Sequence, residues 1–218
     1  MKTILYLMKF ELFLLLKHNL TRSAVINLLS SFIVLLFIRI IFDVVYGALP
    51  WAIIFISALH IFYVPLLFSW EKEKYSDMLQ KYSASQKIFA KWLFVISYSI
   101  ISLLITYLLF FNKKEIVSGI LANALFVTGI LSSVGIVYTY KHVININIDS
   151  KKGYRKFLNA PRFIICFSPI IMIFAWGIIG QLANVALCVY YKLISVAGIA
   201  GFVSMGIWIS SSYVKKSR

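Results

Sequence analysis

The sequence has few charged residues and few residues that usually mark turns or bridges. Of its 218 residues, 13% are charged, only seven are acidic, four are proline and two are cysteine. About 25% charged residues is usual for a soluble domain, so this chain lacks the polar groups needed to cover a surface in water. The two cysteines, Cys166 and Cys188, form no Cys-x-x-Cys pair and indicate neither a redox pair nor a metal site.

Motifs that carry enzymatic chemistry are also missing. No glycine begins a Gly-x-x-x-x-Gly-Lys-[Ser/Thr] loop, so the chain cannot by itself be a P-loop ATPase. It contains no Gly-x-Ser-x-Gly elbow and no His-Glu-x-x-His pair. The acidic residues form no paired-carboxylate site within an apolar segment, and the three histidines are far apart. An enzyme is therefore disfavoured, and we expect this chain to hold no cofactor and no metal.

Long apolar segments take up most of the chain, whose hydrophobic content is 61%. Six of them are close to the length of about 20 residues with which a helix crosses a hydrocarbon core of about 30 Å. They predict an all-α, polytopic membrane protein with a single transmembrane domain over residues 1–218. The expected membrane spans are residues 24–42, 50–69, 92–111, 116–137, 163–181 and 193–212.

The positions of Lys and Arg predict the orientation of these spans. With the N-terminus inside, 18 of the 22 basic residues fall in inside segments and four fall outside, which favours cytoplasmic termini at both ends. Topology and attraction to anionic lipids then account for much of the net charge of +15. No nucleic-acid partner is needed to explain it.

Residues 1–23 predict a helix that lies in the inner membrane interface. Lys9 and Glu11 interrupt the apolar run, and no small-residue cleavage pattern follows, which argues against a signal peptide. The side chains expected to dip into lipid are Leu5, Met8, Leu12 and Leu15 or Leu16. An ordinary cytoplasmic segment leading into the first span is the alternative.

The inside connection over residues 70–91 predicts a short amphipathic helix. Four apolar or aromatic residues recur at i, i+3, i+4 and i+7 and so lie on one stripe of that helix. They are Tyr75, Met78, Leu79 and Tyr82. Ser83 and Ser85 then offer a turn and an N-cap for the helix of the third span. The stripe is expected to fill a groove on a cytosolic partner or to pack on the protein's own helices.

This arrangement resembles the permease subunits of ABC-2 type exporters. Glu71-Lys72-Glu73, Met78-Leu79 and Lys91 are similar to that family's Glu-rich loop, Leu-containing coupling helix and Lys before the third span. This sequence has Ser83-Ala84-Ser85 where the family often has a Pro-containing turn. The N-terminal interfacial helix and the six spans with both ends inside also fit the family, whereas nothing in the sequence indicates the cargo.

The resemblance implies a mechanism and a location. Two permease chains, identical or paralogous, would pair in a bacterial inner membrane, and each would dock a separate ATP-binding subunit that holds ATP and Mg²⁺. The resemblance implies that the residues contacting the ATPase are Glu71, Glu73, Tyr75, Met78, Leu79 and Tyr82.

Two further groups of polar residues are candidates for the transport pathway. Arg39 and Asp43, spaced i, i+4 near the outer end of the first span, can form an ion pair. Their functional interpretation is an outer gate or a cargo contact. The structural alternative is that Arg39 snorkels, so that its guanidinium reaches the membrane interface. Residues 180–192 are too apolar for a free loop and predict an interfacial or re-entrant segment. The resemblance suggests that Gln181 and Asn184 line the outer end of a pathway.

Ordinary structural explanations stand beside these. Tyr190 and Tyr191 can form an aromatic belt at the outer interface, and His60 within the second span is expected to bond to another helix. Small residues four apart, at Gly129 and Ser133 and at Ala197 and Gly201, permit close helix contact. A stand-alone carrier or enzyme and a membrane interaction or immunity protein remain alternatives to the permease.

Overall fold

The fold is helical throughout the part of the chain that the structure describes. The structure is a computed structural model, and it describes residues 2–17, 19–42, 45–64, 68, 80–142, 168, 171 and 184–214. No strand occurs in these ranges, which confirms the all-α prediction for them.

The helices follow the apolar segments of the sequence. In chain order they are α1 (Lys2–Lys17), α2 (Asn19–Phe37), the π-helical segment η1 (Ile38–Phe42), α3 (Val45–Phe62), α6 (Ala84–Phe110), α7 (Lys114–Phe126), the π-helical segment η3 (Val127–Leu131), α8 (Ser132–Lys141) and α11 (Asn184–Val214). The segments α2 and η1 follow each other without a break, as do α7, η3 and α8.

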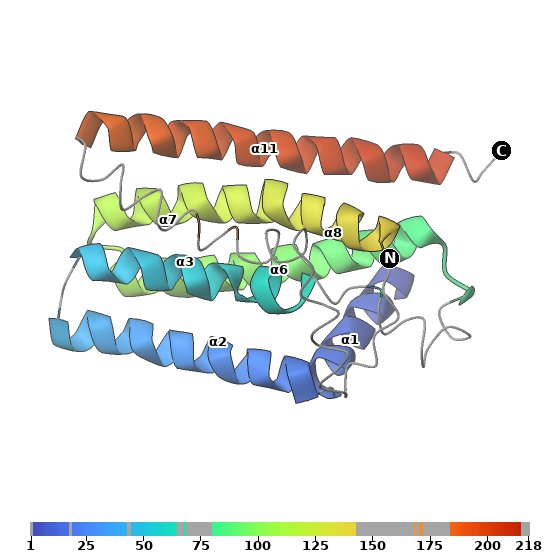
Figure 1. The fold of residues 1–218 in the computed structure, drawn as a ribbon, viewed down its shortest axis with the longest axis horizontal. Coiled ribbons are helices and arrows are strands. Elements are labelled where there is room, and N and C mark those ends of the chain that lie inside the picture. Colours follow the sequence, from blue (N-terminus) through green and yellow to red (C-terminus); the bar gives the residue numbers. More distant parts are fainter. Residues whose placement is uncertain are drawn as a thin grey trace.

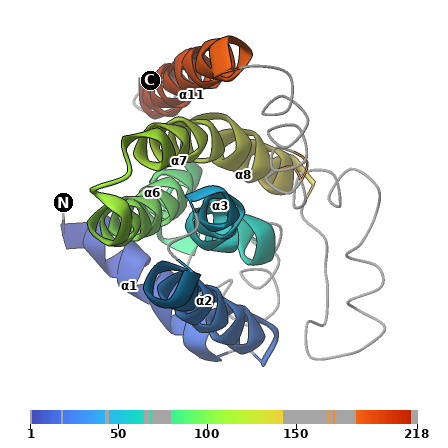
Figure 2. The ribbon, with the colours of Figure 1, turned by 90° about the vertical axis from the view of Figure 1, so that its left-hand side faces the viewer.

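The longer helices lie side by side in a bundle, and α1 crosses one end of it obliquely (Figure 1). Viewed along the bundle, α3 and α6 lie between α2 and the row formed by α7 and α8, and α11 covers the far side of that row (Figure 2). The beginning of α6 and the ends of α8 and α11 lie at the same end as α1 (Figure 1). At the opposite end lie the turn between α6 and α7 and the beginning of α11.

Three helical stretches among the described residues are long and apolar enough to cross a membrane. They are Ala84–Phe110, Val117–Lys141 and Cys188–Ser211. They correspond to the third, fourth and sixth predicted spans. Helices α2 and α3 overlap the first and second predicted spans, while the predicted span 163–181 lies outside the described residues except for Ser168 and Ile171.

The helix of the third predicted span begins at Ala84, ahead of the predicted residue 92, because a capping box starts it there. The Ser83 hydroxyl accepts a hydrogen bond from the Gln86 backbone N–H at 3.2 Å. The Gln86 side chain accepts one from the Ser83 N–H at 3.0 Å. These bonds satisfy donors that the first turn of a helix leaves unpaired. Of the two serines predicted to supply a turn and an N-cap, Ser83 is the N-cap.

The beginning of α11 differs from the prediction. Residues 184–192 form regular helix that continues into the predicted span 193–212, so they do not re-enter as a separate segment. The physical reason is that no proline or glycine interrupts the chain between Asn184 and Gly198, and a continuous helix satisfies its own backbone. Residues 180–183, including Gln181, lie outside the residues that the structure describes.

Glycines bring α11 into backbone contact with η3, as the small residues predicted. A Cβ on Gly201 would lie 2.5 Å from the Gly129 carbonyl oxygen, and a Cβ on Gly129 would collide with Gly198. A Cβ on Gly198 would meet the Leu125 carbonyl oxygen at 2.5 Å. Any side chain larger than hydrogen at these crossings would push the two helices apart.

Helix α1 exposes some of the side chains that were predicted to face lipid. Leu5, Leu12 and Leu16 are exposed, with 57%, 47% and 56% of their surface accessible. Met8 and Leu15 do not join them. Leu15 is buried and Met8 packs against the same core cluster, because both lie on the side of α1 that faces the bundle.

Candidate functional site

A buried ion pair joins α1 to the start of α6. Lys91 Nζ donates a hydrogen bond to Glu11 Oε1. The Tyr63 hydroxyl, just beyond the end of α3, donates to the other carboxylate oxygen, Oε2. The exposed fractions are 0% for Lys91, 3% for Glu11 and 0% for Tyr63. One carboxylate therefore binds groups from two other parts of the bundle.

The surroundings of this pair are apolar. Leu7, Glu11 and Leu14 lie on one face of α1, at i, i+4 and i+7, and all three are buried. Ile88 and Val95, one turn to either side of Lys91, belong to the same core cluster as the two leucines. Charges in such a setting are costly unless they are paired and hydrogen-bonded. Glu11 meets that requirement, because it is paired with Lys91 and accepts a hydrogen bond from Tyr63.

An aromatic side chain covers the lysine from the other side. The Phe68 ring centroid lies 4.9 Å from Lys91 Nζ, within the range of cation–π attraction. Phe68 has a φ of 69°, a left-handed conformation that is uncommon outside glycine and that costs free energy. Its burial, at 5% exposure, and its contact with the lysine hold it there.

From Phe68 a line of aromatic rings leads to the last helix. The Phe68 and Tyr140 centroids lie 5.3 Å apart in an edge-on arrangement. Tyr140 lies 6.5 Å from Trp208 of α11, again edge-on. Such pairs add to stability beyond the area that they bury. We call Glu11, Tyr63, Phe68 and Lys91 the charged cluster; these rings connect it to α8 and α11.

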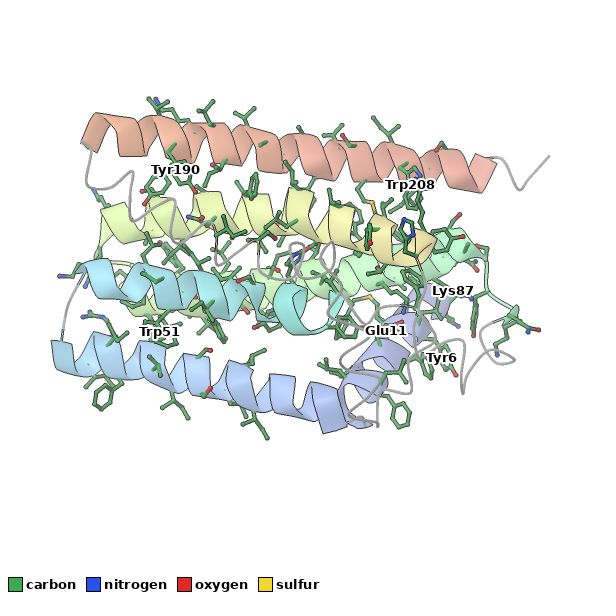
Figure 3. All side chains as sticks on the ribbon, in the orientation of Figure 1. Tyr6, Glu11, Trp51, Lys87, Tyr190 and Trp208 are labelled. Carbon is green, nitrogen blue, oxygen red and sulfur yellow. The ribbon has the colours of Figure 1, made fainter. Side chains whose placement is uncertain are left out.

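The charged cluster lies where the predicted coupling loop begins and ends. Phe68 stands just before residues 70–91, and Lys91 is the last residue of that range. Because α6 already begins at Ala84, the cation–π contact holds the chain just before the predicted loop against the second turn of α6. Figure 3 shows Glu11 at the end of the bundle where α1 crosses. The sequence resemblance named Lys91 but gave it no partner.

Of the residues predicted to contact an ATPase, Tyr82 is described. It is partly buried, and its ring centroid lies 6.2 Å from that of Tyr6 on α1. Lys81 Nζ lies 5.1 Å from the same ring. At this position the stripe packs on the protein's own first helix. The remaining five predicted contact residues lie outside the described residues; they are Glu71, Glu73, Tyr75, Met78 and Leu79.

Arg39 has a structural partner that the sequence did not indicate. Its Nε donates to the Leu109 carbonyl oxygen at 2.8 Å. Leu109 is in the last turn of α6, where carbonyl groups have no partner within the helix. A cation there is favourable because the C-terminal end of a helix carries partial negative charge. Asp43, the predicted partner of Arg39, lies outside the described residues.

The other predicted pathway residue, Asn184, is the first residue of α11. The structure describes its backbone but not its side chain, so its predicted role stays a prediction. Within the second predicted span, His60 is 1% exposed, and its Nδ1 lies 3.5 Å from the Ser132 hydroxyl of α8. The described residues hold no group of three or more His, Cys, Asp or Glu side chains placed to bind a metal.

Sequence reasoning missed the roles of Glu11, Tyr63 and Phe68. Glu11 looked like an interruption of an amphipathic pattern, although a lone carboxylate between Leu7 and Leu14 on one face was a usable signal. A carboxylate on the apolar face of a helix needs a buried cation or donor. Lys91, just before an apolar span, was one candidate for that cation.

The described residues define a helical protein with three helices able to cross a membrane and a buried charged cluster at one end. No protein-family model matches the chain, and neither a curated protein nor a solved structure matches it.

Proposed function

We propose that the chain is the permease subunit of an ATP-driven exporter of the ABC-2 type, with six membrane spans and both termini in the cytoplasm. A separate subunit would bind and hydrolyse ATP, and a second permease chain would complete the transporter. The cytoplasmic loop over residues 70–91 would receive the motion of the ATPase. The membrane is proposed to be the bacterial inner membrane.

One observation carries this proposal: the chain before the loop and the helix after it meet at the charged cluster. Phe68 and Lys91 are in contact, and Lys91 is bonded to Glu11 of α1. The same carboxylate is bonded to Tyr63 at the end of α3. A loop anchored in this way can pass a displacement to several helices at once, because close-packed and bonded groups move together.

The placement of basic residues supports the proposed topology. Helix α1, the turn before α6 and the end of α8 lie at one end of the bundle (Figure 1). They carry the exposed lysines Lys2, Lys9, Lys81 and Lys141. Lys114 and Lys192 belong to the opposite end. The lysine-rich end is the expected cytoplasmic end, and it is the end that holds the charged cluster.

Site-specific photocrosslinking in the native host tests the proposed partner. A benzophenone amino acid replaces Leu79 in the loop or, as a control, Phe111 in the exposed turn between α6 and α7 at the far end of the bundle. We expect position 79, and not position 111, to crosslink to a protein with a P-loop. Equal crosslinking at both positions, or none to a P-loop protein at position 79, would contradict the proposal.

The charged cluster also favours a second candidate, a stand-alone carrier. Ionisable groups at membrane depth often take part in ion or proton pathways, and Glu11 and Lys91 are such a pair at the beginning of a candidate span. A carrier would work without ATP. Transport by the purified chain alone in proteoliposomes, driven by an ion gradient, would establish this candidate in place of the permease.

A further inference from the structure

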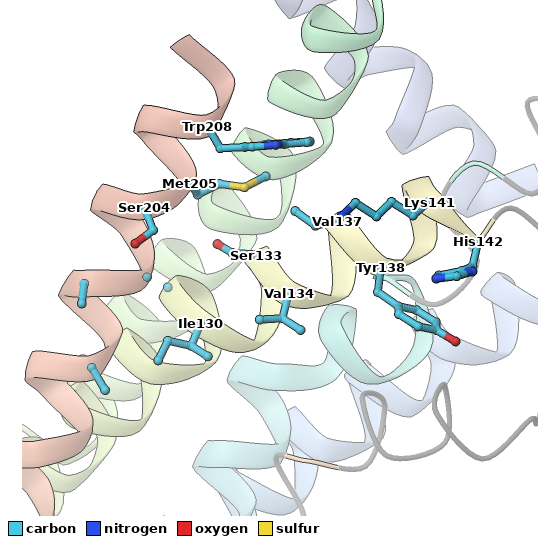
Figure 4. A pocket seen from close by; sticks show the side chains of 14 residues that line it. Ile130, Ser133, Val134, Val137, Tyr138, Lys141, His142, Ser204, Met205 and Trp208 are labelled. Atoms are coloured by element: carbon cyan, nitrogen blue, oxygen red, sulfur yellow. The ribbon is translucent and has the colours of Figure 1, made fainter. Parts of the chain in front are cut away.

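A groove runs between α8 and α11 at the lysine-rich end of the bundle (Figure 4). Its volume is about 890 Å³, within the range of about 300–1,000 Å³ that small-molecule sites occupy. It begins where Gly129 and Gly201 bring the two helices into contact. The groove opens beyond this crossing, as α11 packs closely on α7 and η3 but only loosely on α8.

The walls of the groove are apolar for most of its length. Ile130, Val134 and Val137 line one wall, and Met205 and Trp208 line the other. Val134 is 53% exposed. In a membrane such a surface suits a hydrocarbon chain, since the groove supplies close contacts on two sides.

One end of the groove is cationic. Lys141 and His142, the last residue of α8 and the residue after it, line this end, and both are exposed. The Lys141 side chain lies back along α8 toward Val137 (Figure 4). The His142 ring packs against that of Tyr138 in a tilted arrangement, with their centroids 4.7 Å apart. An apolar channel that ends in an ammonium group is complementary to an anionic amphiphile.

A buried hydroxyl inside the groove gives independent support. Ser133 lines the groove and is only 8% exposed, and its Oγ has no hydrogen-bond partner among the residues that the structure describes. Neighbouring hydroxyls do have partners. Ser132 donates to the Val127 carbonyl oxygen at 2.9 Å, and Thr139 donates to that of Gly135 at 2.8 Å. A buried donor without a partner costs free energy. An acceptor on a bound molecule would satisfy it.

We propose that this groove binds one anionic phospholipid of the surrounding membrane. An acyl chain lies between the apolar walls, the phosphate meets Lys141 and His142, and the Ser133 hydroxyl donates to an ester oxygen of the glycerol. The site does not depend on the proposed export function, because it requires neither an ATPase nor a cargo.

Fluorescence quenching by brominated lipids tests the site, since Trp208 lines the groove. The full chain is reconstituted in nanodiscs containing phosphatidylglycerol or phosphatidylcholine with brominated acyl chains. The chain has five tryptophans, so the emission of Trp208 is taken as the difference between the wild type and Trp208→Phe. We expect Trp208 to be quenched at a phosphatidylglycerol fraction about fivefold lower than for phosphatidylcholine, as one lysine beside an anionic headgroup would produce.

Matched variants separate the site from general lipid contact. Lys141→Gln combined with His142→Gln should remove the preference for phosphatidylglycerol. Lys192→Gln, an exposed lysine at the opposite end of α11, should keep it. Ala200→Phe, a substitution at an exposed position that lines the groove, should reduce quenching by both lipids.

Two results would overturn the proposal. Equal quenching of Trp208 by the two lipids would show that the groove recognises no headgroup. Protection of Trp208 from both lipids would show that a protein segment or a second chain covers the groove. Unchanged far-ultraviolet circular dichroism in every variant ensures that the comparison is made between folded proteins.

Discussion

Lys91 and Glu11 are 80 residues apart in the sequence and bind each other inside the protein. Neither side chain is more than 4% exposed, and Tyr63 donates to the same carboxylate. The pair connects the first helix to the start of a candidate membrane span and lies where the predicted coupling loop begins and ends. Its removal is therefore expected to affect both stability and coupling.

Replacing one member of the pair should be strongly destabilising. Lys91→Met leaves the Glu11 carboxylate buried with the tyrosine hydroxyl as its one partner among the described residues, and breaking a buried ion pair in this way costs about 3–5 kcal/mol. Unfolding by SDS titration in mixed micelles measures the loss. Lys9→Met, which removes an exposed lysine from α1, is the control and should change stability little.

The double variant Glu11→Met with Lys91→Met should recover most of that loss. Apolar side chains of similar length can replace a buried pair at little cost, because the desolvation of both charges is relieved. If Lys91→Met alone is no more destabilising than Lys9→Met, the pair does not stabilise the fold as described.

A side chain at Gly129, where η3 crosses α11, should destabilise the protein. Gly129→Ala places a methyl group against the Gly198 backbone, so the helices must separate and lose packing. Gly206 lies on the same α11 helix, and a Cβ there meets nothing within 4 Å. Gly206→Ala should be neutral or stabilising by up to about 1 kcal/mol, from helix propensity.

The two alanine variants are compared by thermal unfolding in the same detergent. A lower midpoint for Gly129→Ala and an unchanged or higher midpoint for Gly206→Ala are expected. Equal midpoints would mean that the two helices do not touch at Gly129.

The capping box before α6 should protect the first turn of that helix. Ser83→Ala removes the acceptor of the Gln86 N–H, and losing an N-cap costs about 1 kcal/mol. Hydrogen exchange at the Gln86 amide is expected to become faster. Ser83→Asp keeps an acceptor and should retain the protection; equally fast exchange in both variants would contradict the capping role.

Arg39 should stabilise the far end of α6. Arg39→Met removes a charge-assisted hydrogen bond to the Leu109 carbonyl, a loss of about 1.5–3 kcal/mol. A cysteine placed in η1 should then form a disulfide less efficiently with a cysteine placed in the last turn of α6. Lys114→Met, an exposed lysine at the same end, serves as the control, and an equal effect of both substitutions would reject a specific role for Arg39.

Local features of the fold were predictable because the forces that produce them act over short stretches of sequence. Apolar segments of membrane-spanning length indicated the helices, Ser83 indicated the start of α6, and Gly129 and Gly201 indicated a close helix crossing. The prediction of a separate re-entrant segment before residue 193 was wrong, because apolar composition alone does not separate such a segment from the first turns of a continuous helix.

The charged cluster was not predictable in the same way. Glu11 and Lys91 each resemble a surface charge when considered alone, and only the packing of α1 across the bundle brings them together. Phe68 has a left-handed backbone conformation that no local signal indicates. Long-range pairing of this kind depends on tertiary contacts, which hydropathy does not encode.

Co-purification is the most direct test of the central claim that this chain is the membrane subunit of an ATP-driven exporter. The tagged chain is purified from its native host in nanodiscs, and the preparation is examined for a bound P-loop protein and for ATP hydrolysis. The account predicts that such a subunit is recovered and active with the wild type and is lost with Leu79→Asp. Recovery of the chain alone, or an unchanged complex with Leu79→Asp, would contradict it.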